Sequence, residues 1–317
     1  MEFDTSKILL REAVCEVLME LAKEDPSIVV LDADLMNASG LSRFAKEFPG
    51  RAFNCGIQES NMVGVAGGLS AMGYVPLVHS FAAFAARRTT DQVFLAGVYG
   101  QQNLKILGTD PGACGTSNGG SHMALEDIGI MRSMAGVTVV DFTDEAMVRS
   151  VLPQIMKTPG VCYIRLFRKT KRKVYPDGTQ FTLGKAYTAR NGKDVAILAE
   201  GAVMVPEALK AAALLEEQGI SARVVDLFTI KPLDVQAVVK AAKETGAVLT
   251  AENHNIYNGL GSAVAEVLAE QGIGVPFARV GFQDTVGETA DMDYIMKKFG
   301  LDYQTIAAKA KELVRLK

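Results

Sequence analysis

Short β-branched runs alternate with longer amphipathic segments along the whole chain, and this alternation constrains the fold more than any other feature. The runs of the first half are SIVVLDAD at 27–34, RAFNCG at 51–56, VPLVHSF at 75–81, LKILGTD at 104–110, VTVVDFT at 137–143 and VCYIRLF at 161–167. Runs that are largely apolar are typical of strands buried on both faces of a parallel sheet. Segment 9–25 carries apolar residues at helical spacing, with charges on its other side. The sequence predicts an α/β fold with a doubly wound parallel sheet.

A second, shorter alternation follows a change in composition. Residues 169–194 are rich in charge, Gly and Pro and lack a long apolar period, which is typical of a domain boundary. Beyond them come the runs VAILAEG, ARVVDLFT, AVLTAENH and FARVGF. A chain of 317 residues with 49% hydrophobic content is long enough for two cores. We therefore expect one domain at 1–175 and a smaller α/β domain at 190–317.

Composition excludes several classes of protein. The formal net charge of −3 gives no basic surplus for nucleic acid, and the apolar runs are too short to cross a bilayer. The N-terminal residues include acids where a signal peptide would be basic. The four cysteines are widely spaced, without the pairing that a zinc site needs. We expect a cytoplasmic protein with no membrane or nucleic-acid partner and no metal ligands of its own.

Polar, cationic and aromatic residues gather where the predicted strands end. Ligands of open α/β sheets bind in the crevice outside the carboxyl ends of the strands, so these positions are the candidates for a site. In chain order they are Asp32, Asp34, Glu59, His79, Phe81, Phe84, the glycine-rich loop from Gly108 to His122, Arg165 and Arg168.

Glu59 is the sharpest candidate, because it opens the apolar, glycine-loaded segment NCGIQESNMVGVAGGLSAMG at 54–73, which reads as a buried helix. Glycine inside a helix costs roughly 1 kcal/mol relative to alanine, so Gly64, Gly67 and Gly68 suggest that the backbone approaches something closely. The alternative is an acid in the first helical turn that only complements the helix dipole.

The other candidates also have a plainer interpretation. Phe81 and Phe84 stand three residues apart, a spacing that serves a hydrophobic core as well as a platform for a cofactor. The glycine-rich loop at 108–122 fits neither of the common phosphate-binding patterns. Arg165 and Arg168 enter a basic run that could be solvated surface, although a guanidinium at a strand end is well placed to bind a phosphate.

Three segments together resemble the transketolase family of thiamine-diphosphate enzymes. They are GIQESNMVGVAGGLSAMGY at 56–74, SHMALEDIGIMRSMAGVTVV at 121–140 and AENHNIYNGLGSAVAEVL at 251–268. The resemblance covers nearly the whole chain and is to the C-terminal half of transketolase, encoded as a separate subunit. It implies a pyrimidine-binding domain followed by the smaller C-terminal domain of the family.

The resemblance also implies roles for single residues. Glu59 would hydrogen-bond N1′ of the cofactor's aminopyrimidine from an apolar pocket that disfavours the charged carboxylate. Phe81 and Phe84 would stack on that ring, and Asp34 would lie near the thiazolium and the phosphate of the cofactor. His122 would act in catalysis beside the reacting carbonyl. The residues implied in substrate binding are His122, Arg168, Arg165, Ser39, Asn118 and His79.

Two positions depart from the family pattern. An acidic residue that reads the hydroxyl configuration of the donor is replaced by Asn118, and a histidine at the entrance of the same loop is replaced by Asp110. The resemblance therefore leaves the donor and acceptor sugars open, while the residues for cofactor activation are present.

No Gly-Asp-Gly motif for Mg²⁺ and diphosphate occurs in the sequence. The resemblance implies that an N-terminal partner subunit supplies those ligands, in an α₂β₂ heterotetramer with paired pyrimidine domains. The implied reaction moves a two-carbon ketol unit from a ketose phosphate to an aldose phosphate, as in the pentose phosphate pathway. The alternatives are a 1-deoxyxylulose-5-phosphate synthase-like enzyme, a 2-oxoacid dehydrogenase β-type subunit, and a non-catalytic paralogue.

Overall fold

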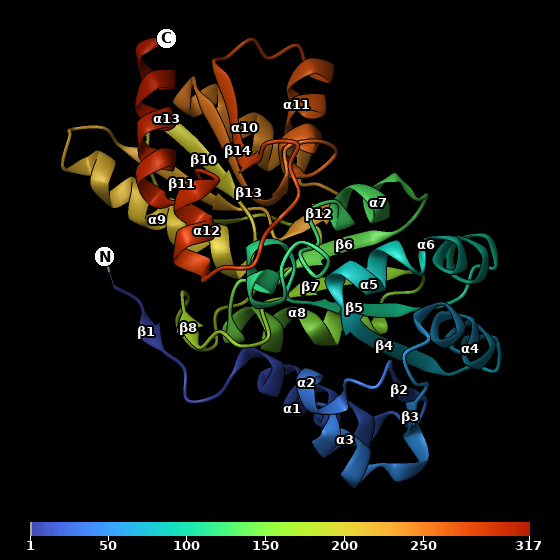
Figure 1. Ribbon diagram of the computed structural model, residues 1–317. Helices are drawn as coiled ribbons and strands as arrows, with labels where there is room; N and C mark the ends of the chain where they lie inside the picture. The colour runs from blue at the N-terminus through green and yellow to red at the C-terminus, as the bar shows by residue number, and fades with distance from the viewer. Residues whose placement is uncertain (1) are drawn as a thin grey trace.

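The computed structural model describes residues 2–317 and confirms an α/β fold built on two main sheets. Figure 1 shows the first sheet with its helices in the lower part, coloured blue to green, and the second above it in yellow to red. The first sheet has seven strands and the second five, so the second unit is the smaller, as predicted. The limits 1–175 and 190–317 stay a prediction.

Six strands of the first sheet run parallel, in the spatial order β6-β7-β5-β4-β2-β3. A seventh strand from the second half of the sequence pairs antiparallel with β6 and ties the two units together. The bounds are β2 (Ile28–Asp32), β3 (Ala52–Asn54), β4 (Val75–Phe81), β5 (Lys105–Thr109), β6 (Thr138–Asp141), β7 (Cys162–Leu166) and β12 (Thr229–Lys231).

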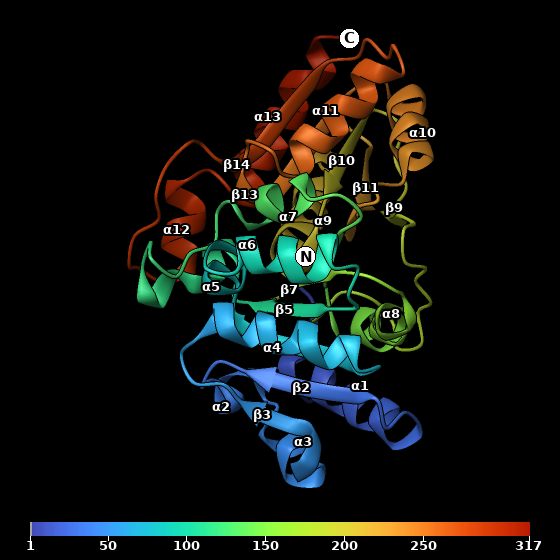
Figure 2. The same cartoon turned by 90° about the vertical axis from the view of Figure 1, so that its right-hand side faces the viewer.

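Helices cover both faces of this sheet, which confirms the doubly wound arrangement. Along β2, Ile28 and Val30 pack into one hydrophobic cluster, while Val29 and Leu31 pack into another on the opposite face. Figure 2 looks onto the second face, where α4, α5 and α7 lie across the strands. The helices are α1 (Leu10–Glu24) and α8 (Glu145–Lys157) on one side, and α4 (Glu59–Ala71), α5 (Ala82–Arg87) and α7 (Asp127–Ser133) on the other.

Shorter helices connect these elements. They are α2 (Met36–Ser39), α3 (Ser42–Glu47) and α6 (Thr90–Gln92), with the 3₁₀ helices η1 (Pro49–Arg51) and η3 (Gly112–Asn118) and the π-helix η2 (Val93–Tyr99). Two short strands, β1 (Asp4–Thr5) and β8 (Arg172–Lys173), form an antiparallel pair. This pair joins the N-terminal segment to the stretch of chain that leads into the second unit.

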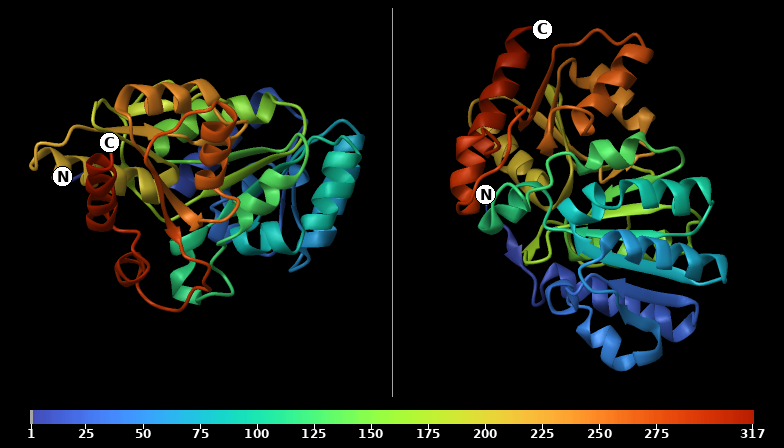
Figure 3. Two further views of the ribbon diagram at one scale, coloured as in Figure 1. Left: turned by 90° about the horizontal axis from the view of Figure 1, so that it is seen from above. Right: turned by 45° about the vertical axis from the view of Figure 1, so that its right-hand side comes forward.

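The second sheet has four parallel strands and one antiparallel edge strand, in the order β14-β13-β10-β11-β9. Its strands are β9 (Tyr187–Arg190), β10 (Val195–Ala199), β11 (Ala222–Asp226), β13 (Val248–Asn255) and β14 (Phe277–Phe282). Its helices are α9 (Gly201–Glu216), α10 (Val235–Thr245), α11 (Leu260–Glu270), α12 (Met292–Lys298) and α13 (Tyr303–Arg315). In Figure 3, α12 lies beside η3, so this unit touches the loop that follows β5.

Helix α4 is only half buried, which corrects the expectation of a buried helix. Met62 and Val63 pack against the sheet, whereas Val65 is 41% exposed. A Cβ on Gly67 would lie 2.8 Å from Ala96 of η2, so this glycine does mark a close approach. Apart from the backbone of α4 itself, no atom of the described chain lies within 4 Å of a Cβ on Gly64 or Gly68.

The exposed side of α4 continues into an apolar surface on the neighbouring π-helix η2. We call this surface the α4–η2 face; its large exposed apolar residues are Val65, Met72, Phe94, Leu95 and Tyr99. Contiguous exposed apolar surface on a globular unit marks a site of association.

Candidate functional site

Glu59 is the first residue of α4 and is only 3% exposed. One of its carboxylate oxygens accepts a hydrogen bond from Ser80 Oγ at 2.9 Å, and the other accepts from Arg88 Nη1 at 3.1 Å. The carboxylate is therefore buried, as predicted, but it is not in an apolar pocket. A hydroxyl from β4 and a guanidinium complete its contacts.

Phe81 and Phe84 stand beside this carboxylate at the end of β4 and the start of α5. Their ring centroids are 6.3 Å apart, and the His122 ring lies 4.9 Å from that of Phe84. Both phenylalanines are partly exposed rather than sealed in the core. Their exposed faces favour the interpretation as a platform over that as core residues.

Arg88 occupies the space between the platform and the carboxylate. Its Cζ lies 4.1 Å from the Phe84 ring centroid while Nη1 donates to Glu59. A guanidinium is a planar group that carries N–H donors, and the side chain is half-exposed. The cradle therefore fits a flat, nitrogen-bearing ring that lies on Phe84 and hydrogen-bonds Glu59, provided that Arg88 moves out.

The loop after β5 carries two more of the predicted residues. Asn118 ends η3 and is exposed, and the half-buried His122 bonds Ser121 Oγ through Nδ1 at 2.9 Å. The second unit presses on this loop, since a Cβ on Gly120 would lie 2.5 Å from the carbonyl oxygen of Gly287.

Arg168 lies at the other end of the aromatic platform. Its Cζ is 5.1 Å from the Phe81 ring centroid, and its Nε donates to Asp110 Oδ2 at 2.5 Å. Its side chain is 10% exposed and that of Asp110 is 8% exposed. The structure thus brings Glu59, Phe81, Phe84, His122 and Arg168 together in one row.

Asp34 lies apart from that row. It is exposed, directly follows Ala33 at the end of β2 in a left-handed conformation with φ of 65°, and accepts a hydrogen bond from Asn54 Nδ2 at 2.9 Å. This position leaves the carboxylate open to a ligand at the same sheet edge.

Three residues predicted to bind substrate are fully buried in the described chain, and their role in substrate binding stays a prediction. His79 Nδ1 lies 2.7 Å from Asp32 and Nε2 lies 3.1 Å from Thr109. Ser39 Oγ donates to Met36 O at 3.0 Å inside the turn of α2. Arg165 is buried within an ion cluster.

The ion cluster around Arg165 lies between the two units. The guanidinium donates to Asp127 at 2.9 Å and to Asp141 at 2.5 Å, and it also pairs with Glu200 of the second unit at 3.4 Å. Three carboxylates surround one cation. Burial raises the pKa of Asp141 to about 6 and that of Glu200 well above its usual value, against the opposing effect of Arg165. The cluster therefore retains protons that exposed carboxyl groups would release.

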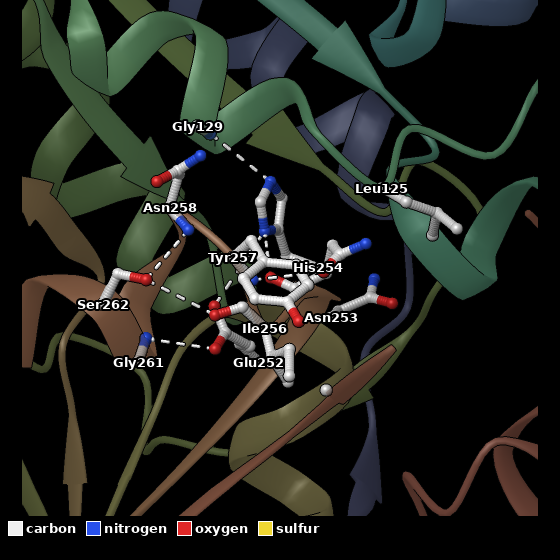
Figure 4. A network of polar contacts seen from close by, with 12 residues as sticks. Leu125, Gly129, Glu252, Asn253, His254, Ile256, Tyr257, Asn258, Gly261 and Ser262 are labelled. Carbon is white, nitrogen blue, oxygen red and sulfur yellow. Dashed lines mark hydrogen bonds and ion pairs between the residues drawn. The ribbon is translucent and has the colours of Figure 1, made fainter. Parts of the chain in front are cut away.

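The Glu-Asn-His segment of β13 completes this junction (Figure 4). Asn253 accepts from Ala113 N at 2.8 Å and donates to Pro111 O at 3.0 Å, so it holds the start of the η3 loop. His254 Nε2 accepts from Gly129 N at 3.3 Å. Burial lowers the pKa of His254 to about 4, which keeps the ring neutral and able to accept this bond.

Sequence reasoning picked out Asp32, His79 and Arg165 at strand ends, but it missed Asp141 and the pairings that strand register sets. Parallel pairing sets Asp32 opposite His79 and Asp141 opposite Arg165. It also missed Arg88, although an arginine four residues after Phe84 is a spacing that lets a helical side chain reach back.

Other features of the described residues do not compete with this site. Within residues 2–317, no cluster of three or more His, Cys, Asp or Glu side chains could hold a metal ion, and no helix is long and apolar enough to span a membrane. A pocket of about 760 Å³ lies between α7 and α11. Its cations are engaged, Arg132 with Glu266 and Lys231 with two backbone carbonyls.

Comparisons with known proteins agree with this architecture. The family model for the transketolase pyrimidine-binding domain matches residues 6–173, and the model for the transketolase C-terminal domain matches residues 184–306. Subunit SqwH of the 6-deoxy-6-sulfo-D-fructose transketolase from Clostridium sp. (strain MSTE9) is 48% identical, over 97% of this chain and 95% of that protein. One subunit of the apulose-4-phosphate transketolase from Phocaeicola vulgatus is 36% identical, over 97% of this chain and 98% of that protein.

A solved structure has the same fold. A split gene transketolase, described as an inactive beta4 tetramer, superposes with a TM-score of 0.90 at 41% identity. The match covers 98% of this chain and 99% of that one.

Proposed function

Because the chain belongs to the transketolase family, as a subunit that carries the pyrimidine-binding and C-terminal domains of a split enzyme, we propose that it transfers a two-carbon ketol unit from a ketose to an aldehyde acceptor. The observation that carries the proposal is the cradle formed by Glu59, Phe84 and the planar Arg88 group between them. Members of this family use thiamine diphosphate, which supplies an electron sink for C–C cleavage when bound.

The residues of the cradle then have separate tasks. Glu59 binds the ring nitrogen of the aminopyrimidine and holds a proton there, with Ser80 fixing the carboxylate in place. Phe81 and Phe84 exclude water from that hydrogen bond and so strengthen it. Arg88 leaves Glu59 when the ring enters. His122, 4.9 Å from Phe84 between ring centroids, hydrogen-bonds the sugar beside the reacting carbon.

A partner subunit completes the site in this proposal. Mg²⁺ and the diphosphate need hard oxygen ligands, which the N-terminal subunit would supply. The α4–η2 face, where Val65, Phe94 and Leu95 are exposed, would bury itself against a second copy of this chain. The related beta4 tetramer is described as inactive, which supports the need for the other subunit.

The sugar substrates remain part of the proposal. One relative is named for 6-deoxy-6-sulfo-D-fructose and another for apulose 4-phosphate, which favours a specialised sugar over the pentose phosphate pathway. Asn118 is exposed in the loop above the platform and replaces the family's acid, so the donor's hydroxyl configuration can differ as well. We place the reaction in the cytoplasm.

A non-catalytic paralogue is the second candidate. The substitutions at Asp110 and Asn118 favour it, whereas the intact Glu59 and its platform favour an enzyme. The same geometry also serves a 1-deoxyxylulose-5-phosphate synthase-like enzyme or a 2-oxoacid dehydrogenase β-type subunit, which share the cofactor chemistry.

The test is reconstitution. The chain is mixed with an N-terminal transketolase subunit, thiamine diphosphate and Mg²⁺, and ketol transfer is measured for a panel of ketoses with aldehyde acceptors. We expect transfer only when both subunits are present. Cofactor binding by the complex without transfer from any ketose would favour the non-catalytic or oxoacid alternatives.

A further inference from the structure

Asp110 accepts hydrogen bonds from N–H groups of Arg168 that an anionic substrate would otherwise use. Arg168 donates to Asp110 Oδ2 through Nε at 2.5 Å, and its backbone N–H donates to Oδ1 at 3.2 Å. Arg168 Nη1 donates to Ala38 O at 3.3 Å. Within residues 2–317, no protein group accepts a hydrogen bond from Nη2. Arginine usually binds phosphate through two parallel N–H groups, and here one nitrogen is left for a ligand.

The carboxylate of Asp110 cannot move away. Asp110 directly follows β5, and its backbone N–H donates to Leu166 O at 2.9 Å. Its φ is 53°, in the left-handed region that glycine, asparagine and aspartate adopt most readily. The residue is 6% exposed, so the side chain has no solvent to turn into. A negative charge is thus built into this end of the platform.

The other cations nearby do not restore the missing donors. Arg11 Nη1 donates to Ala38 O at 2.9 Å and to Asn37 O at 3.5 Å, so it serves the end of α2. Lys169 is exposed, where its charge is screened by water and salt.

These contacts distinguish anions by charge. A phosphate monoester carries about −1.5 to −2 charges at pH 7, whereas a sulfonate of the same tetrahedral shape carries one. A second negative charge within a few ångströms of a buried carboxylate is disfavoured. Resting on the function proposed above, we propose that Asp110 makes this end of the site selective for a sugar with a singly charged terminal anion, such as a sulfonate, over a phosphorylated one.

The test compares three ketose donors on the reconstituted complex, with a 6-phosphate, a 6-sulfonate or a free 6-hydroxyl. We expect wild-type kcat/KM to be about tenfold or more higher for the sulfonate than for the phosphate. Asp110→Asn keeps the side-chain shape and suits the left-handed backbone, and it should raise kcat/KM for the phosphate by about tenfold while the hydroxyl donor changes little. Asp226→Asn, the same change at a buried site between the units, is the matched control.

A binding measurement separates this proposal from the function on which it rests. Calorimetric titration of the complex with unreactive hexitol 6-phosphate and 6-deoxy-6-sulfohexitol needs no turnover. Tighter binding of the sulfonate supports the proposal even if no donor is converted, which would overturn only the ketol-transfer function. A wild-type preference for phosphate, or an equal effect of Asp110→Asn on all three donors, overturns the role of Asp110.

Discussion

Two arginines three residues apart, Arg165 and Arg168, end in opposite surroundings. Arg165 lies within β7 and is buried among carboxylates from both units. Arg168 follows the strand, lies over Phe81 and pairs with a single carboxylate at the edge of the open platform. The first holds the two units together, and the second is left where a ligand can reach it.

The difference teaches that charge at a strand end does not by itself indicate a binding site. The cluster around Arg165 has more charged groups than the platform, yet its contacts are closed within the protein. At the platform, the buried carboxylate of Glu59 has partly exposed rings and a half-exposed arginine as its neighbours. The Glu59 site differs from the Arg165 cluster because exposed, movable groups surround its buried carboxylate.

The largest expected effect is on stability, from Arg165→Met. Removing the cation leaves Asp127, Asp141 and Glu200 buried without compensation, and we expect the free energy of unfolding to fall by about 3–5 kcal/mol. Denaturant unfolding followed by circular dichroism measures this. Arg168→Met is the matched control, with an expected loss of about 1–2 kcal/mol, because it leaves one carboxylate that can take up a proton. Equal losses for the two variants would contradict the comparison.

Asn253→Ala tests whether the closed junction also positions the open site. The change leaves Ala113 N–H and Pro111 C=O without partners, a cost of about 1–3 kcal/mol, and should loosen the loop that carries His122. We expect the KM for the ketose donor to rise about tenfold in the complex, with cofactor affinity kept.

The control for Asn253→Ala is Asn255→Ala in the same strand. The Asn255 side-chain oxygen accepts a hydrogen bond only from the nearby Tyr257 N–H. A rise in KM from Asn255→Ala as large as that from Asn253→Ala would show that the effect is not specific to the loop contact.

The smallest expected effect concerns pH. Burial raises the pKa of Asp226 to about 8, against hydrogen bonds from Thr143 and Tyr175. An unfolded aspartate titrates near 4, so this group's stabilising contribution is fully present below pH 4 and is lost as pH rises through the window from about 4 to 8. Asp226→Asn should flatten that decline. Between pH 5 and pH 8, the free energy of unfolding of the variant should therefore fall by about 1–2 kcal/mol less than that of wild type.

Melting temperatures of the two proteins at each pH unit from 5 to 8 check this prediction. The exposed Asp293→Asn serves as the control, and it should leave the pH dependence unchanged. Parallel pH curves for wild type and Asp226→Asn would contradict the raised pKa.

The fold was readable from the sequence because the strands are short, largely apolar and separated by helices of the right period. The helix expected at 9–25 is α1 (Leu10–Glu24), and all six parallel strands of the first sheet coincide with predicted runs. The burial of Glu59 at the start of its helix was also expected, but the local pattern fits an acid that complements the helix dipole as well, and the family resemblance decided between the two.

The sequence could not predict the burial and the partners of His79, Ser39 and Arg165, because these depend on contacts between segments far apart in the chain. Strand register decides that His79 meets Asp32, and the packing of the second unit decides that Arg165 meets Glu200. The sequence did not predict that α4 is half exposed, for the same reason. A glycine-rich apolar helix has the same sequence pattern whether it packs against its own chain or against another chain.

The most direct test of the account is turnover by the reconstituted complex with Glu59→Gln. Glutamine keeps the shape and can still bond Ser80, but it cannot hold the proton at the ring nitrogen, so we predict a loss of ketol transfer of about 100-fold or more. The exposed Glu288→Gln, which removes only a surface pairing with Lys298, should change neither assembly nor turnover. Loss of transfer in a variant that still assembles and melts like wild type is the predicted result; full turnover by Glu59→Gln would contradict the assignment of this site.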